Sequence, residues 1–463
     1  MQGREKITLI DDSTSIAARR PPVRIDAFYA MITLGSTAIW SVLGGWLLYF
    51  YLPPEGEGPQ LVPAALYGGT MFVTRLANAA IAPPIGHLSD RMRSRWGRRL
   101  PFMFFSALPM LIFFVLLWMP PVPGESLANL AYLAFVLMLY NVAYAFNQIP
   151  YTALLPELAL TDHHRVRMSA WSASFLLIGM ILSSLAGPII GSLGYVPAAL
   201  IFAGASLPFF YLPFLVLRER RERHIPIAAQ PSFRSSLSAM VQNRAFLVMT
   251  ATGVCYWGIT TLVQSMIPYI VTEICHLSTG DTLVFYVPAV LAALACYPLI
   301  AWLSDRWGKW AVFAASLLAA AIVLPGLMLI GDWLPVPLKA QGIAWITVQA
   351  VAMSGVMVLP PAFGAEITDH DADRTGQRRE GTYYATWGML DQLTNGVVTA
   401  AVPLLLLLGR SRSDPHGPLG VRMVGVIGGI LMFIAFLIFL CYPLRHRVLH
   451  GGNDVECQHA ADS

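Results

Sequence analysis

Long apolar runs separated by short polar connections dominate the chain. Twelve such runs can be delimited between charged, proline or glycine residues, and each reaches the length of about 20 residues that an α-helix needs to cross a bilayer. We expect helices at residues 27–52, 61–86, 100–119, 127–153, 168–191, 197–217, 245–271, 281–302, 310–331, 343–366, 382–409 and 421–443. An even number of spans places both ends of the chain on the same side of the membrane.

The composition agrees with a chain that lies mostly within a membrane. Of its 463 residues, 56% are hydrophobic and 12% are charged, whereas soluble proteins average about 25% charged residues. Twelve spans of about 22 residues use more than half of the chain and leave no room for a large soluble domain. The sequence therefore predicts an all-α membrane protein and excludes the disordered and collagen-like classes.

Two further features limit the kinds of site that can be present. The five cysteines include no CxxC pair, so we expect neither a disulfide framework nor a zinc site, and no other metal centre. The first 26 residues are polar and lack the apolar core of a cleavable signal peptide. We expect them to form a tail ahead of the first span.

Lysine and arginine are concentrated in every second connection. Of the 30 basic residues, 25 fall in the two tails and in the connections 89–99, 154–167, 218–244, 303–309 and 367–381, and three fall in the alternate loops. Because basic residues are retained on the cytoplasmic face, we expect both termini to be cytoplasmic. The net charge of +4 then reflects topology, and no nucleic-acid partner is expected.

The longest basic connection divides the chain into two similar parts. We expect a cytoplasmic tail at 1–26, a six-helix bundle at 27–217, a cytoplasmic linker at 218–244, a second six-helix bundle at 245–443 and a cytoplasmic tail at 444–463. The segment Leu88-Ser89-Asp90-Arg91 recurs 215 residues later as Leu303-Ser304-Asp305-Arg306, each time at the end of the second helix of its half. A tandem duplication explains this repeat better than chance does.

The repeated motif could act as a conformational latch. An aspartate at a helix end beside arginine can form charge-assisted hydrogen bonds that hold the cytoplasmic ends of the halves together, and glycine permits the tight turn that follows. Glu157 and Glu366 lie at cytoplasmic helix ends, where they could pair with Arg167 or Arg379. We expect the latch to comprise Gly86, Asp90, Arg91, Gly97, Arg98, Glu157, Asp305, Arg306, Gly308, Lys309 and Glu366. Retention of basic residues in a cytoplasmic loop would explain the arginines but not the repeated motif.

The loop after the second span resembles the signature loop of the major facilitator superfamily. Its extended form, Arg93-Ser94-Arg95-Trp96-Gly97-Arg98-Arg99, resembles more specifically that of the glycoside-pentoside-hexuronide:cation symporters, the melibiose permease group. Further similar segments are Ile149-Pro150-Tyr151, Leu155-Pro156-Glu157, Glu366-Ile367-Thr368-Asp369 and Arg374-Thr375-Gly376-Gln377-Arg378-Arg379-Glu380-Gly381. The resemblance implies a major facilitator fold of twelve transmembrane helices in two six-helix pseudo-repeats, which works by alternating access.

The chain departs from this family at the positions that bind the coupling cation and the sugar. The paired helix-2 aspartates of the family correspond to Asn78 and Ala82 here, and its helix-11 lysine corresponds to Gln392. Family acids in helices 4 and 1 correspond to Gln148 and Thr37. Because sodium is a hard cation that should favour carboxylate oxygens, we expect a divergent member of the family that does not couple to sodium.

Two ionisable residues are expected near the middle of the membrane. Arg75 lies in the second span and Asp391 in the eleventh, and charges at this depth usually mark functional sites. The two could pair across the seam between the halves or face a watery cavity separately, and Arg75 could instead bind backbone carbonyls. Asp391 is the candidate proton carrier, because a desolvated carboxylate can be neutralised by a proton and recharged on the other side.

Polar and aromatic residues at similar depth complete the expected cavity: Trp40, Asn78, Asn141, Tyr144, Asn147, Gln148, Tyr256, Trp257, Gln264, Tyr384 and Trp387. The amides are stronger candidates than the aromatics, since an unpaired amide in hydrocarbon costs several kcal/mol. We expect the substrate and coupling site at Thr37, Arg75, Asn78, Asn147, Gln148, Tyr256, Trp387, Asp391 and Gln392.

Together these features predict a secondary active transporter rather than an enzyme. The sequence has no catalytic motif and no Gly-rich phosphate loop followed by Lys and Ser or Thr. We expect proton-coupled symport of a glycoside or polyol-like metabolite. The alternatives are a carrier of an amphiphile such as a lysolipid, and a non-transporting sensor or assembly factor. We also expect a monomer in the cell inner membrane, without a cofactor, whose partners are the bilayer and a small-molecule substrate.

Overall fold

The computed structural model describes residues 23–54, 57–92, 94–159, 162–217, 240–375, 380–408 and 419–444, and this part of the chain contains helices and no strands. The first half consists of α2 (Val23–Tyr51), α3 (Ala64–Arg91), α4 (Leu100–Leu116), α5 (Leu127–Leu158), α6 (Asp162–Ser183), α7 (Ala186–Leu193), α8 (Tyr195–Tyr211) and η1 (Leu212–Leu215). The second half consists of α10 (Arg244–Tyr269), η2 (Ile270–Ile274), η3 (Thr279–Asp281), α11 (Thr282–Trp307), α12 (Lys309–Val323), η4 (Leu324–Leu329), α13 (Leu338–Val358), α14 (Pro360–Thr375), α15 (Glu380–Leu406) and α16 (Leu419–Phe439). Each of the twelve predicted spans corresponds to one helix or to a helix with its continuation.

Two predicted spans are each divided into two helices. The span predicted at 168–191 is α6 followed by α7, and Pro188 lacks the N–H group that would bond to Ser184 in an unbroken helix. The span predicted at 343–366 is α13 followed by α14, which begins at Pro360. Proline therefore sets the breaks that the apolar pattern did not resolve.

The first helix starts earlier than its apolar run. It begins at Val23 rather than at residue 27, so Asp26, which we assigned from the sequence to the N-terminal tail, lies inside α2 and is fully buried. That assignment was wrong because the charge of Asp26 suggested that the residue belongs to the polar tail and not to the helix.

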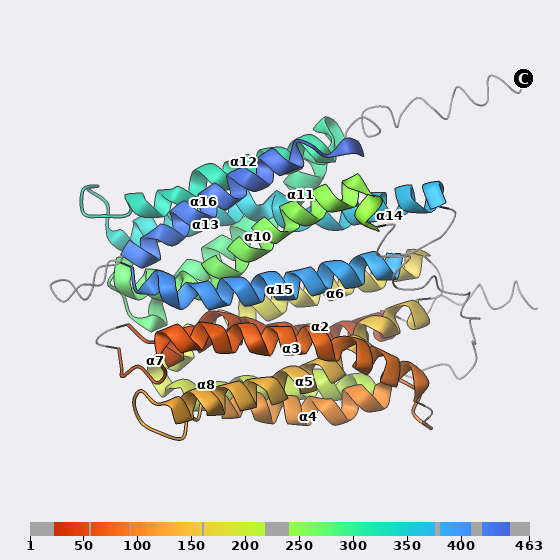
Figure 1. The fold of residues 1–463 in the computed structure, drawn as a ribbon, viewed down its shortest axis with the longest axis horizontal. Coiled ribbons are helices and arrows are strands. Elements are labelled where there is room, and N and C mark those ends of the chain that lie inside the picture. Colours follow the sequence, from red (N-terminus) through yellow and green to blue (C-terminus); the bar gives the residue numbers. More distant parts are fainter. Residues whose placement is uncertain are drawn as a thin grey trace, which may run out of the picture.

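The same packing pattern occurs in both halves. In the first half α2 contacts α6 and α8, and α5 contacts α3 and α4. In the second half α10 contacts α15 and α16 in the same way, and α13 contacts α11 and α12. Figure 1 shows the halves as two bundles stacked against each other, with α3 and α15 at the seam. The predicted fold of two six-helix pseudo-repeats is confirmed.

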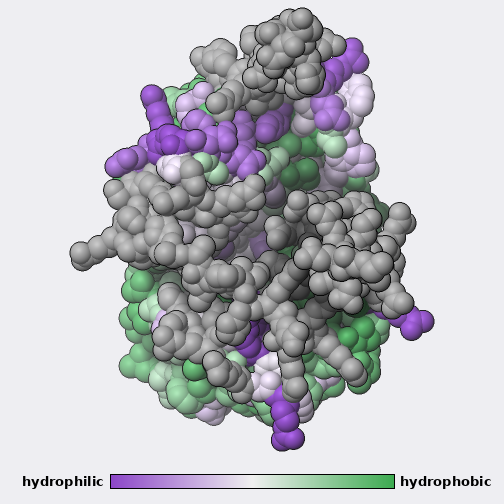
Figure 2. All heavy atoms as spheres, turned by 90° about the vertical axis from the view of Figure 1, so that its right-hand side faces the viewer, coloured by the Kyte–Doolittle hydropathy of each residue, from purple (hydrophilic) through white to green (hydrophobic). Residues whose placement is uncertain are grey.

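The outside of the bundle is suited to lipid. Among the described residues, ten helices are long and apolar enough to span a membrane, and α4 is a shorter apolar helix of 17 residues. Large apolar side chains such as Phe105, Leu215 and Ile322 are exposed on the flanks. Figure 2 looks onto the end that carries connections 92–99 and 307–309, where hydrophilic residues gather above hydrophobic flanks. The protein is a multi-pass membrane protein, and we call this end the basic end.

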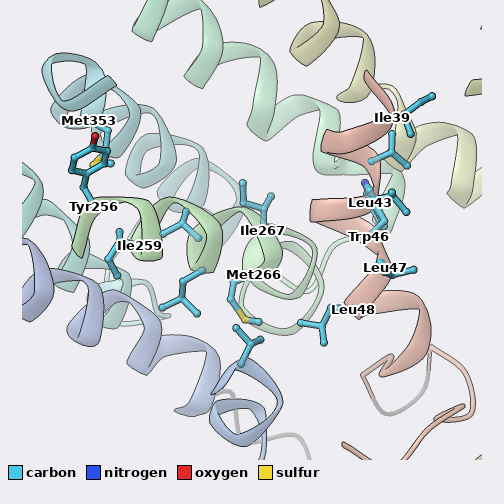
Figure 3. Close-up of a cluster of buried hydrophobic side chains, with 14 of the residues drawn as sticks. Ile39, Leu43, Trp46, Leu47, Leu48, Tyr256, Ile259, Met266, Ile267 and Met353 are labelled. Carbon is cyan, nitrogen blue, oxygen red and sulfur yellow. The ribbon is translucent and has the colours of Figure 1, made fainter. Parts of the chain in front are cut away.

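The two halves touch at the opposite end of the bundle. The Tyr49 hydroxyl donates to Thr272 Oγ1 at 3.2 Å, which joins α2 to η2. The Tyr269 hydroxyl donates to the Leu52 carbonyl oxygen at 2.7 Å. The apolar side chains of α2 and α10 labelled in Figure 3 belong to one buried cluster. The two hydrogen bonds hold the halves together at the opposite end.

Small residues allow the close approach at this end. A Cβ atom on Gly68 of α3 would lie 2.2 Å from the carbonyl oxygen of Ala400 on α15. A Cβ atom on Gly187 of α7 would lie 1.7 Å from Thr282 Oγ1 at the start of α11. Glycine is therefore required at both positions for the halves to meet as they do here.

Substitution of Gly68 by valine is expected to force α3 and α15 apart, because overpacking of a tight contact costs about 1–3 kcal/mol. We expect a lower thermal unfolding midpoint. We also expect faster labelling of a cysteine placed at Thr399, which lines the cavity described below, when the native cysteines have been replaced. The matched control is Gly69→Val, since a Cβ on Gly69 meets nothing within 4 Å. Equal behaviour of the two variants would contradict the close contact at Gly68.

Candidate functional site

A cavity of about 110 Å³ lies between the two halves. Helices α2, α3 and α5 of the first half and α10 and α15 of the second half supply its walls. The lining residues are Trp40, Leu43, Gly44, Leu47, Leu48, Tyr67, Met71, Arg75, Leu137, Tyr140, Asn141, Thr261, Gln264, Ser265, Asn395, Thr399 and Val402. The wall thus combines one cation, amides, hydroxyls and aromatic rings, and any ligand bound there would touch both halves at once.

Arg75 is the cationic group of this cavity. Its guanidinium carbon lies 4.7 Å from the centre of the Trp40 ring, within the range of a cation–π contact. Its Nη1 donates to Gln392 Oε1 on α15 at 3.1 Å. Because α3 belongs to the first half and α15 to the second, this hydrogen bond crosses the seam. Arg75 therefore links the two halves at the cavity.

Asp391 lies next to this link in a short chain of polar side chains. Its Oδ1 accepts a hydrogen bond from Asn395 Nδ2 at 3.0 Å, and Asn395 Oδ1 accepts from Thr261 Oγ1 on α10. The charges of Arg75 and Asp391 interact electrostatically. Within the described residues, however, they do not form a direct ion pair, and Arg75 bonds to Gln392 instead. Of the alternatives considered from the sequence, the structure does not show the direct pair.

Two polar atoms near Arg75 have no protein partner among the described residues. The Tyr140 hydroxyl is buried in the cavity wall, and Asn78 Oδ1 is buried three residues after Arg75 on α3. A buried polar group without a hydrogen bond costs about 1–3 kcal/mol. The Tyr140 side chain in the cavity wall therefore carries a hydroxyl whose hydrogen-bonding capacity the described residues leave unused.

Several residues predicted for the site lie elsewhere. Asn147 Nδ2 donates to the Met103 carbonyl oxygen at 3.1 Å and ties α5 to α4. Gln148 Nε2 donates to Asn147 Oδ1 at 3.1 Å. Asn147 thus bonds both to the backbone of α4 and to Gln148, so its buried amide has a structural explanation.

Three other predicted residues are packed outside the cavity lining. Trp387 Nε1 donates to Thr250 Oγ1 at 2.7 Å and ties α15 to α10. Tyr256 is buried on α10 near Met353, as Figure 3 shows. Thr37 lies against Gly179 of α6. The structure thus brings together Arg75, Gln392 and Asp391. Of the three residues packed outside the lining, Tyr256 interacts electrostatically with Asp391.

Sequence reasoning missed part of the cavity wall. Tyr67, Thr261, Ser265 and Thr399 line it but were not among the candidates. One signal was available, because Asp391, Asn395 and Thr399 are spaced by four residues and so share a helix face. Tyr67 carried no comparable signal.

Some of the predicted latch residues lie among the described residues. Gly97 and Gly308 have φ angles of 111° and 83°, which glycine adopts readily. Lys309 Nζ lies 2.7 Å from Glu366 Oε2, so this ion pair joins α12 to α14 within the second half. The side chains of Asp90, Arg91 and Glu157, and residue Arg379, lie outside the described residues. A lock between the halves therefore stays a prediction.

The remaining latch residues are accessible or packed locally. Asp305, Arg306 and Arg98 are exposed at the basic end, and Arg306 lies over the Trp302 ring at 5.6 Å. Gly86 lies close to Ile149 of α5, where an added Cβ would make an ordinary contact of 3.8 Å. None of these observations joins the two halves.

A buried ion cluster at the basic end was not predicted. Asp26 of α2 is completely buried, its Oδ1 lies 2.7 Å from His164 Nε2, and its Oδ2 accepts from Arg167 Nε at 2.5 Å. Both partners lie near the start of α6. The cluster fixes the basic ends of α2 and α6 to each other, within the first half.

Comparison with known proteins agrees with this architecture. The sequence profile described as MFS/sugar transport protein matches residues 28–446. The Glucuronide carrier protein homolog of Escherichia coli (strain K12) is 25% identical over 420 residues, which is 87% of this chain and 88% of the relative. The Isoprimeverose transporter of Lactiplantibacillus pentosus is 25% identical over 467 residues, which is 94% of this chain and 91% of the relative.

A further relative matches locally, and a solved structure shares the fold. The Uncharacterized symporter sll1374 of Synechocystis sp. is 33% identical over 176 residues, which is 37% of this chain and 31% of that protein. A crystal structure of a D-xylose-proton symporter superposes with a TM-score of 0.65 at 14% identity, covering 90% of this chain and 96% of that chain. At this identity the superposition shows the fold alone.

Proposed function

Because the chain belongs to the MFS/sugar transport protein family, whose members are transporters and not enzymes, we propose that it moves a glycoside or a similar sugar together with protons by alternating access. The observation that carries this proposal is the placement of Arg75, Gln392 and Asp391 where the two halves meet. A bond that crosses the seam can break and reform as the halves rock. Ligand and proton binding beside it can therefore bias that motion.

The chemistry of the cavity wall favours a sugar. Amide and hydroxyl groups such as Asn141, Gln264 and Tyr140 can bond to sugar hydroxyls, and Trp40 offers an aromatic face. The Arg75 guanidinium can donate hydrogen bonds to an anionic or a neutral oxygen. The names of the relatives include a glucuronide carrier homolog and an isoprimeverose transporter, which supports the glycoside class here.

The cavity in this structure is too small for such a substrate. Its volume of about 110 Å³ falls below the roughly 300–1,000 Å³ of typical ligand pockets. We infer that the site must open before it loads. Since the halves are in contact at the opposite end, loading in this state would proceed from the basic end.

We propose protons as the coupling ion. Within the described part of the chain, Asp391 is the acidic side chain that lies beside the cavity. Its charged neighbour is Arg75 and not a second carboxylate. Sodium would favour several oxygen ligands, including carboxylates. A single carboxylate that gains and loses a proton needs no such cage.

We further propose that the basic end faces the cytoplasm of a cell whose inner membrane holds the protein as a monomer. The distribution of basic residues supports this orientation. The family and the relatives favour the sugar transporter over the lysolipid carrier and over the non-transporting sensor or assembly factor.

The test is substrate-driven proton movement in proteoliposomes with a pH dye in the lumen. We expect external addition of the correct glycoside, with a glucuronide and a neutral pentose-containing disaccharide as first probes, to acidify the lumen without sodium. Uptake that requires sodium and leaves lumenal pH unchanged would refute proton coupling. Solute flux that occurs only with lysolipids would refute the sugar class.

A further inference from the structure

An apolar groove of about 420 Å³ runs along the outside of the first half between α4 and α5. It is separate from the cavity between the halves. Its lining residues are Met92, Pro101, Phe102, Phe105, Ser106, Pro109, Phe113, Leu139, Val142, Ala143 and Phe146. Apart from Ser106 these side chains are apolar, so the groove is suited to a hydrocarbon chain rather than to a sugar.

The groove faces the surroundings of the protein and occupies one end of the bundle. Phe105 in its wall is 66% exposed, and residues on the same side of α4, such as Leu108 and Ile112, are exposed as well. From Pro101 to Phe113 the helix rises about 18 Å at about 1.5 Å per residue. Half of a hydrocarbon core of about 30 Å is about 15 Å. The groove is therefore long enough for one acyl chain of the leaflet at the basic end.

Basic residues lie in the connection that borders the groove. Met92 lines the groove, and the nearby Trp96 packs on its wall. The Trp96 ring stacks on the Phe105 ring, and the ring centres lie 6.2 Å apart. Arg95 precedes this tryptophan and is exposed. The sequence has four arginines and no acidic residue between 92 and 99. A phosphate at this depth would find a cation beside an interfacial tryptophan.

We propose that this groove binds an anionic phospholipid from the leaflet at the basic end. One acyl chain would lie between α4 and α5, and the phosphate group would contact Arg95. Charge complementarity selects an anionic headgroup over a zwitterionic one, while the apolar wall holds the chain. The proposal does not depend on which solute is transported.

The test is native mass spectrometry of purified, delipidated protein titrated with phosphatidylglycerol or with phosphatidylcholine. We expect tighter binding of phosphatidylglycerol, and Arg95→Gln should weaken that binding about fivefold, as expected for the loss of one basic residue near a membrane surface. Binding of phosphatidylcholine should not change in this variant. Equal affinity for the two lipids, or an unchanged affinity in Arg95→Gln, would overturn the proposal.

Two further variants separate this site from general surface attraction. Val142→Trp fills the groove from a half-buried position and should abolish tight binding of phosphatidylglycerol, with folding checked by the thermal midpoint. Arg306→Gln removes an exposed cation at the same end of the other half and should leave the affinity unchanged. Tight binding retained in Val142→Trp, or an equal loss in Arg306→Gln, would contradict a site between α4 and α5.

Discussion

Asp391→Asn is expected to abolish proton-driven accumulation of the substrate while substrate exchange continues. Asparagine keeps the size of the side chain and an oxygen that can accept from Asn395 Nδ2, as Asp391 Oδ1 does at 3.0 Å. It cannot gain or lose a proton at physiological pH. The internal substrate concentration should therefore not rise above the external one, although the cavity can still bind and exchange substrate.

The measurement compares concentrative uptake with counterflow in the same proteoliposomes. In the native protein, uptake should depend on an imposed pH gradient, and this dependence should disappear in Asp391→Asn. Asp332→Asn is the matched control, since Asp332 is an exposed aspartate in a connection of the second half. Unchanged accumulation by Asp391→Asn would remove this residue from the coupling mechanism.

Replacement of Arg75 should produce the second large effect. Its loss removes a charge-assisted hydrogen bond across the seam, and such bonds contribute about 1.5–3 kcal/mol, or about 10- to 150-fold in an equilibrium constant. We expect Arg75→Gln to weaken substrate-dependent transport by a factor in this range. Arg75→Lys should restore little of this transport activity. Lysine lacks the planar guanidinium group that lies over Trp40 while it bonds to Gln392.

Initial uptake rates over a range of substrate concentrations measure this effect. Gln392→Ala should show a smaller loss, since it removes the hydrogen-bond partner but leaves the cation and its contact with Trp40. Arg422→Gln is the control, because Arg422 bonds to the Met328 carbonyl oxygen in an exposed position. Full activity of Arg75→Gln would show that the bond across the seam is dispensable.

Most of the fold could be predicted because the bilayer imposes long apolar runs. The predicted spans correspond to the observed helices, and the repeat at Asp90 and Asp305 indicated two equivalent halves that the packing shows. The helix boundaries were less predictable where the burial of a charged residue depends on a partner that is distant in the sequence. Asp26 looked like part of a polar tail, but its charge is satisfied by His164 and Arg167, which follow it by 138 and 141 residues.

Part of the site was predictable because charged side chains are rare near the middle of a membrane and usually mark functional sites there. Arg75 and Asp391 were identified on that basis, and Gln392 from its position in the family resemblance. Asn147 and Gln148 were equally plausible as buried amides, yet Asn147 bonds to a carbonyl group of α4. Whether a buried amide serves a ligand or a neighbouring helix depends on contacts between helices, which the sequence does not specify.

The central claim is that the two halves rock about the cavity that contains Arg75. Distances between spin labels at both ends of the bundle test it most directly. One pair would occupy Ser169 and Ala301 near the basic end, and the other Glu125 and Val336 at the opposite end, all of which are exposed. When substrate and proton are added together, we expect the distance at one end to shorten and that at the other to lengthen. Distances that stay fixed, or change in the same direction at both ends, would contradict the account.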